Sequence, residues 1–173
     1  AQDPRARAYY LKSLLDDMVL QLFTSSEEAQ LEQSIYQGVA AQSLGTADDL
    51  DALTGQVLAR FGQEPERYPP LRSSWISKRL MYDDPNYLVN YLYAGLLAVQ
   101  FYVQDQRDPE GFGQRYLAVL GEGFDRAPNE QVAQLLGQTP DWPALVEADL
   151  QVFNQLAAQL RALHARIEQG QGA

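Results

Sequence analysis

Two tyrosines and an asparagine near the middle of the chain, Tyr87, Asn90 and Tyr91, have the residue types and the spacing to bind a polar ligand. Tyr87 and Tyr91 are four residues apart, so on a helix their side chains share one face, with Asn90 beside them. Two phenolic hydroxyls and one amide would then meet a single ligand as neutral hydrogen-bonding groups. The alternative is that the tyrosines fill the core, with their hydroxyls reaching the surface.

These residues belong to an aromatic tract, Tyr82–Val103, which contains five tyrosines, and residues 85–104 carry no charge. We expect a helix that starts at Asp83-Asp84-Pro85, ends near Asp105 and is buried on every side, because it is apolar all round. Buried tyrosine hydroxyls need partners or a cavity, so the tract predicts a polar site inside a dry core. The tyrosines assigned to the core alone are Tyr93 and Tyr102.

The composition of the 173-residue chain excludes several kinds of chemistry. It has no cysteine and one histidine, His164, so disulfides, Cys-based zinc sites and the H-E-x-x-H zinc motif cannot form within it. The net charge of −10 argues against binding to nucleic acid and to anionic membrane surfaces, which need clustered Lys and Arg. The uncharged tract is not expected to span a membrane, because its flanks are acidic rather than basic.

Two basic residues precede the tract by one or two helical turns. Arg79 and Lys78 are candidates for holding a substrate carboxylate, Arg79 by two parallel hydrogen bonds. The alternative is a solvated face, or a salt bridge to Asp83 or Asp84. His164 is expected to serve the end of the last helix rather than catalysis, because cations favour a helix C-terminus.

Hydrophobic periodicity, cap residues and breaks at Gly and Pro predict an all-α chain of seven to eight helices around one central buried helix. We expect a single domain over residues 1–173, with a tail at 170–173. Thr46 and Asp49 have the spacing of a capping box. Thr24 stands either at a cap or within one continuing helix. The remaining expected segments are helices at about 4–41, 47–61, 71–81, 109–120, 128–137 and 143–168, and a loop at 62–71.

Part of the tract resembles a known family of enzymes. Pro85-Asn-Tyr87-Leu-Val-Asn90-Tyr91, followed by Ala98-Val-Gln-Phe-Tyr102, is similar to a pattern in the oligoendopeptidase F / thimet oligopeptidase family of zinc metallopeptidases. Further similar segments stand in the family's order on both sides of the tract and extend the resemblance over nearly the whole chain: Leu14–Phe23, Ala29–Glu32, Asp108–Phe124, and Leu135–Trp142 continuing into the last helix.

The resemblance implies a zinc-dependent oligopeptidase that cleaves short peptides in an enclosed cleft. In that family H-E-x-x-H and a glutamate on a following helix bind zinc, and all of these lie upstream of the segments matched here. This chain would then be the C-terminal cleft wall, with the upstream zinc-bearing part and a peptide substrate as its partners. The implied catalytic residues are Tyr87 and Tyr91, and the implied substrate-binding residues are Tyr82, Asn90 and Arg79. We expect this chain alone neither to bind the catalytic zinc nor to hydrolyse peptides.

Three positions depart from the family pattern. Leu80 stands where the family has a substrate-binding histidine, Leu88 where it has a second tyrosine, and Asn90 where it has an aspartate. Tyr82 is the candidate to replace the histidine. The departures keep two alternatives open: a non-catalytic helical peptide-binding or interaction module derived from that fold, and an unrelated ligand-binding bundle with a closed pocket.

Overall fold

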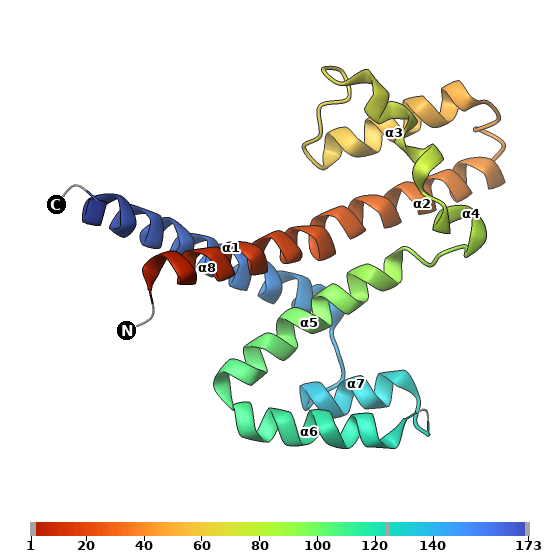
Figure 1. Cartoon of the computed structure of the whole chain (residues 1–173). Helices are drawn as coiled ribbons and strands as arrows, with labels where there is room; N and C mark the ends of the chain where they lie inside the picture. Colours follow the sequence, from red (N-terminus) through yellow and green to blue (C-terminus); the bar gives the residue numbers. More distant parts are fainter. Residues whose placement is uncertain (1–2, 124, 172–173) are drawn as a thin grey trace. The chain divides into compact units, whose positions relative to one another are not determined.

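Helices make up the regular structure of residues 3–123 and 125–171, which are the residues that the computed structural model describes (Figure 1). Eight α-helices, one π-helical segment and one 3₁₀ helix occur in this part of the chain, and none of it is a strand. The predicted all-α class is therefore confirmed. The helices fall into two compact units: unit 2 is the continuous stretch Val19–Ala94, and unit 1 combines the residues before and after it.

Unit 2 begins with the π-helical segment η1 (Val19–Thr24) and continues through the elements α2 (Ser25–Ala40), α3 (Ala47–Arg60), η2 (Pro69–Ser77), α4 (Leu80–Asp83) and the first residues of α5 (Val89–Arg107). Helix α3 packs against both α2 and η2. A buried cluster lies among these elements and consists of Leu31, Ile35, Val57, Met81 and Leu88. The segment around the predicted site is thus anchored to the core of unit 2 through Met81 and Leu88.

Unit 1 contains α1 (Pro4–Met18), the rest of α5, α6 (Pro109–Glu122), α7 (Pro128–Leu136) and α8 (Trp142–Gln171). Helix α1 packs against α8, so the first and last helices are neighbours within this unit. Helices α6 and α7 lie side by side, as Figure 1 shows. Local signals set these elements: Asp108 caps α6 through the N–H of Gly111, and Gly137 ends α7 in the left-handed conformation.

The aromatic tract differs from the expectation. Helix α5 starts at Val89 rather than at Pro85, because Asn86 has a φ of 64° and cannot continue a right-handed helix. The prediction of a helix buried on every side is wrong: α5 buries Gly95, Leu96 and Val99 and leaves Tyr91 and Tyr93 each 40% exposed. Water satisfies an exposed phenol, so these hydroxyls need no sealed cavity.

Two smaller expectations are also revised. Thr24 has helical backbone angles and no side-chain cap bond, so the alternative of one continuing helix holds there, with η1 inside it. The predicted tail is wrong at its start because α8 runs to Gln171, while residues 172–173 lie outside the described part of the chain. In place of the expected short helix at 71–81, the 3₁₀ helix η2 begins at Pro69, within the expected loop at 62–71, and α4 follows at Leu80–Asp83.

Candidate functional site

The two predicted catalytic tyrosines meet on the surface of unit 2. The ring centroids of Tyr87 and Tyr91 are 5.6 Å apart with the ring planes at 75°, an edge-to-face contact. Tyr87 is 41% exposed and Tyr91 is 40% exposed. Leu88, which lies between them in sequence, is only 4% exposed and belongs to the buried cluster, so the segment that carries the pair is attached to the core. An edge-to-face contact is a favoured arrangement of two aromatic rings.

Tyr87 lies in a turn just before α5, and Tyr91 lies in the first turn of that helix. The N–H of Tyr87 donates to the carbonyl of Asp84 (3.0 Å), and the N–H of Asn90 donates to the carbonyl of Tyr87 (2.9 Å). The N–H of Tyr91 donates to the carbonyl of Leu88 (3.2 Å). Asn90, which precedes Tyr91 in the sequence, is exposed. The predicted trio therefore lies within one short run of tight turns at the start of α5.

The hydroxyl of Tyr82 has a partner within unit 2. It donates to the carbonyl of Trp75 over 3.3 Å, and burial raises the pKa of Tyr82 above its ordinary value. Trp75 is itself held by its indole N–H, which donates to Asp51 over 2.7 Å. Tyr82 is consequently tied to η2, and a ligand would meet mainly its acceptor oxygen and its exposed ring.

Arg79 forms a salt bridge with Asp83, which the sequence analysis gave as the alternative to substrate binding. Its Nε lies 3.2 Å from a carboxylate oxygen of Asp83, and its side chain is 81% exposed. Lys78 is paired with Glu28 of α2. Arg79 and Leu88 nevertheless line one pocket of about 300 Å³. A carboxylate ligand reaching Arg79 would have to compete with Asp83 for the guanidinium.

Below the exposed turn lies a buried polar group that the sequence analysis did not single out. Glu32 of α2 is 2% exposed, and its Oε1 accepts from the backbone N–H of Asn86 over 2.8 Å. The Tyr36 hydroxyl lies 3.1 Å from the same oxygen and also bonds the carbonyl of Met81. Burial, and then the contact with Glu32, raise the pKa of Tyr36. The available sequence signal was a carboxylate directly beside the apolar stripe of Leu31 and Ile35.

A second pocket in unit 2, of about 450 Å³, has Glu32 and Asn86 among its lining residues, together with Val89 and Tyr93 of α5. Tyr93 and Tyr91 are two residues apart on the helix, so their side chains point to different sides of it. The pocket beside Tyr93 and the surface at Tyr91 are therefore separate features of the same segment.

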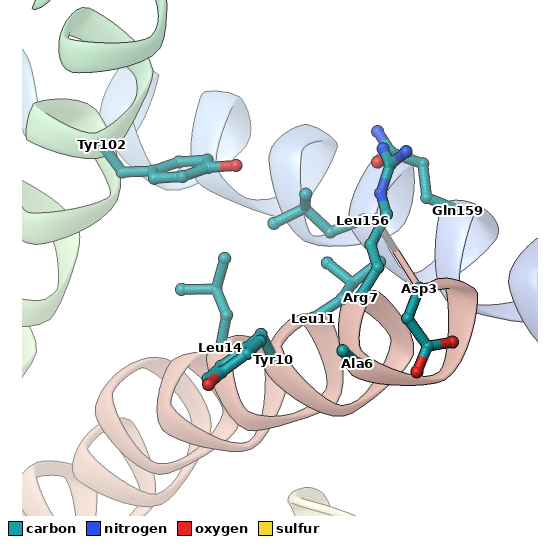
Figure 2. A pocket seen from close by; sticks show the side chains of 9 residues that line it. All are labelled: Asp3, Ala6, Arg7, Tyr10, Leu11, Leu14, Tyr102, Leu156 and Gln159. Carbon is teal, nitrogen blue, oxygen red and sulfur yellow. The ribbon is translucent and has the colours of Figure 1, made fainter. Parts of the chain in front are cut away.

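Unit 1 has a pocket of its own, of about 430 Å³ (Figure 2). Its wall includes Tyr10 and Leu14 of α1 and Leu156 of α8, and Figure 2 shows the Tyr102 ring of α5 projecting toward the space between these helices. Tyr102, expected in the core, is half-buried at this wall. The lining combines apolar side chains with the charged Asp3 and Arg7 and the polar groups of Tyr10, Tyr102 and Gln159.

Neither a metal centre nor a membrane span emerges from the structure as far as it is described. Among residues 3–123 and 125–171, no three His, Asp or Glu side chains gather where they could hold one metal ion. None of the helices in that part of the chain has the length and apolar character needed to cross a bilayer.

Comparisons with family models, with curated proteins and with solved structures find no match for this chain.

Proposed function

We propose that this chain forms one wall of the substrate cleft of a zinc-dependent oligopeptidase of the oligoendopeptidase F type. The observation that carries the proposal is the Tyr87–Tyr91 pair, whose rings are in edge-to-face contact and about 40% exposed above the buried Leu88. The resemblance of Pro85–Tyr91 to the family pattern supports the same assignment. In this proposal the zinc-bearing part lies outside this chain.

The chemistry of the tyrosine pair suits a peptide ligand. A peptide carbonyl accepts hydrogen bonds, and the phenols of Tyr87 and Tyr91 are neutral donors that need no change of charge to bind it. When a peptide bond is hydrolysed, negative charge develops on that oxygen, and donors already aimed at it stabilise the transition state. Asn90 supplies a further amide for the peptide backbone, and Arg79 a cation for a carboxylate.

Zinc, where another part of the enzyme binds it, supplies an activated water for hydrolysis. The described residues of this chain gather no ligand set for that ion. The share of this chain in the reaction is therefore to bind and orient the peptide through Tyr82, Tyr87, Asn90 and Tyr91.

A second candidate function is a peptide-binding module of the same fold without catalysis. Leu80, at the place of the family's substrate-binding histidine, packs against the buried cluster of unit 2. Leu88, at the place of a family tyrosine, is buried in that cluster. Two positions that serve substrate in the family would here serve the core, while the exposed tyrosine pair would still bind a peptide.

The first experiment measures binding of a short, unstructured, internally quenched peptide to this chain. We expect Tyr87→Phe and Tyr91→Phe each to weaken binding roughly fivefold, since each removes one neutral hydrogen bond worth about 1 kcal/mol. Tyr116→Phe is the matched control, because Tyr116 is 41% exposed on α6, in unit 1. Its affinity should equal that of the unchanged chain. Equal affinities for all three variants would contradict the proposed site.

The same peptide distinguishes the two candidate functions. This chain with added zinc should not release the fluorophore, and real turnover by a clean sample would contradict the assignment of zinc to another part. In an enzyme that contains both parts, Tyr87→Phe and Tyr91→Phe should lower kcat/KM. If the complete protein binds the peptide through these tyrosines without cleaving it, the non-catalytic module is the correct choice.

A further inference from the structure

The segment that presents the tyrosine pair is attached to α2 at two points. At one end, the backbone N–H of Asn86 donates to the buried carboxylate of Glu32 over 2.8 Å. At the other end, the carbonyl of Met81 accepts from the Tyr36 hydroxyl. Glu32 and Tyr36 are one helical turn apart and in contact with each other. The exposed residues 82–85 span the interval between these two anchors.

The bond to Glu32 falls at the residue with the unusual backbone. Asn86 has a φ of 64°, in the left-handed region that asparagine adopts more readily than most residues. Its N–H is taken by a side chain of α2, so it is not available to a turn of α5. The chain then enters α5 at Val89, with Tyr87 held outside the helix and against Tyr91. The position of Tyr87 thus follows from the conformation of Asn86.

A buried carboxylate is an expensive way to hold a turn if packing is its only purpose. Its charge loses hydration, and apolar residues of similar volume are often equally stabilising at such sites. A carboxylate oxygen, however, fixes the direction of a backbone N–H, which an apolar side chain cannot do. The core of unit 2 already includes Leu31 and Ile35 on either side of Glu32 in sequence. Glu32 therefore contributes by fixing the direction of the Asn86 N–H rather than by apolar packing.

We propose that Glu32 is a positioning residue: its buried carboxylate fixes Asn86 in the left-handed conformation and thereby holds Tyr87 against Tyr91 for peptide binding. Tyr36 secures the opposite end of the segment through its hydrogen bond to the carbonyl of Met81. The contribution of Glu32 to peptide binding rests on the proposed function, while its positioning of Asn86 and Tyr87 does not depend on it.

Amide hydrogen exchange at Asn86 tests whether Glu32 positions this residue. Asn86 is exposed, yet its amide should exchange slowly because a buried carboxylate accepts its hydrogen. Glu32→Ala should accelerate that exchange roughly tenfold to a hundredfold, the effect of losing one hydrogen bond to a charged group. Glu32→Gln keeps an acceptor oxygen and should preserve most of the protection. The nuclear Overhauser contact between the Tyr87 and Tyr91 rings should be lost in Glu32→Ala and kept in Glu32→Gln.

Leu58→Ala is the control for general destabilisation. Leu58 is buried in α3 of the same unit, and neither the hydrogen bond at Met81 nor the one at Asn86 involves it. This variant should lower the melting temperature and leave the ring contact in place. Tyr36→Phe should loosen Tyr82 while the Asn86 amide stays protected. An unchanged Asn86 amide in Glu32→Ala would overturn the proposal.

Peptide affinity then tests whether this positioning contributes to peptide binding. Glu32→Ala should weaken binding of the internally quenched peptide roughly as much as Tyr87→Phe, about fivefold, and Glu32→Gln should restore it. If the unchanged chain binds no peptide but the Asn86 amide responds to Glu32→Ala, the proposed function fails and the positioning role stands. If Tyr87→Phe weakens binding and Glu32→Ala does not, the positioning role fails and the proposed function stands.

Discussion

Two buried carboxylates in this chain have opposite surroundings. Glu32 in unit 2 accepts from the backbone N–H of Asn86, and its Oε1 also lies within hydrogen-bond distance of the Tyr36 hydroxyl. Asp149 in unit 1 is fully buried on α8, where Gln100 donates to its Oδ1 over 2.6 Å. Its Oδ2 has no hydrogen-bond partner among the described residues. Burial raises the pKa of Asp149 to about 6, against the opposing effect of the Gln100 hydrogen bond.

The raised pKa of Asp149 predicts a pH-dependent stability of unit 1. Because the unfolded carboxyl titrates near pH 4, the folded chain binds more protons between about pH 4 and pH 6, and the free energy of unfolding falls as pH rises through that window. The loss is on the order of 3 kcal/mol, since each unit of pKa difference corresponds to about 1.4 kcal/mol. Asp149→Asn removes this titration, so it should stabilise the chain at pH 7 and have little effect at pH 4.

Urea unfolding at the two pH values measures this difference. The control is Asp17→Asn, which changes an exposed aspartate of α1 in the same unit. It should show no comparable gain in stability at pH 7. If Asp149→Asn destabilises the chain equally at pH 4 and pH 7, the carboxylate is ionised in the folded state and the prediction is wrong.

At the scale of the element, two similar sequence signals have different outcomes. Thr46 precedes Asp49 by three residues, and its side chain accepts from the Asp49 N–H over 3.2 Å in a complete capping box. Thr24 precedes Glu27 by the same spacing but lies inside a continuing helix without a cap bond. The difference lies in the residues before each threonine. Gly45 stands in a non-helical stretch ahead of α3, whereas η1 leads directly into α2.

This contrast predicts different costs for the same substitution. Thr46→Ala should lower the free energy of unfolding by about 1 kcal/mol, because the backbone N–H of Asp49 at the start of α3 loses its acceptor. Thr24→Ala should change it by less than about 0.5 kcal/mol. Chemical denaturation of both variants checks the comparison. Equal losses would mean that the Thr46 hydroxyl contributes nothing beyond what any threonine in a helix does.

The helices were predictable where their signals are local. The caps of α3 and α6 and the glycine after α7 act within a few residues, so the sequence pattern located these ends closely. The start of α5 was not predictable in this way, because Glu32 holds Asn86 from another element, 54 positions earlier in the chain. For the site, the spacing of Tyr87 and Tyr91 predicted that the two side chains would share one helix face, but it indicated neither the turn that carries Tyr87 nor the exposure of the pair.

At the scale of the whole molecule, the expectation was one domain over residues 1–173, and the chain forms two compact units. No linker rich in Gly, Ser or Pro separates them, because helix α5 carries residues of both. Composition therefore gave no boundary signal. Each unit has its own buried residues, including Leu58 in unit 2 and Leu15 in unit 1.

Matched core substitutions test whether the units are also separate in stability. Leu15→Ala in α1 and Leu58→Ala in α3 each empty a buried leucine site and should each cost about 2 to 5 kcal/mol. Since α1 packs against α8, Leu15→Ala should accelerate amide exchange in α8 and leave the Asn86 amide protected. Leu58→Ala should do the reverse. Equal acceleration in both units by either variant would show one cooperative domain, and the single-domain expectation from the sequence would then hold for stability even though the contacts divide in two.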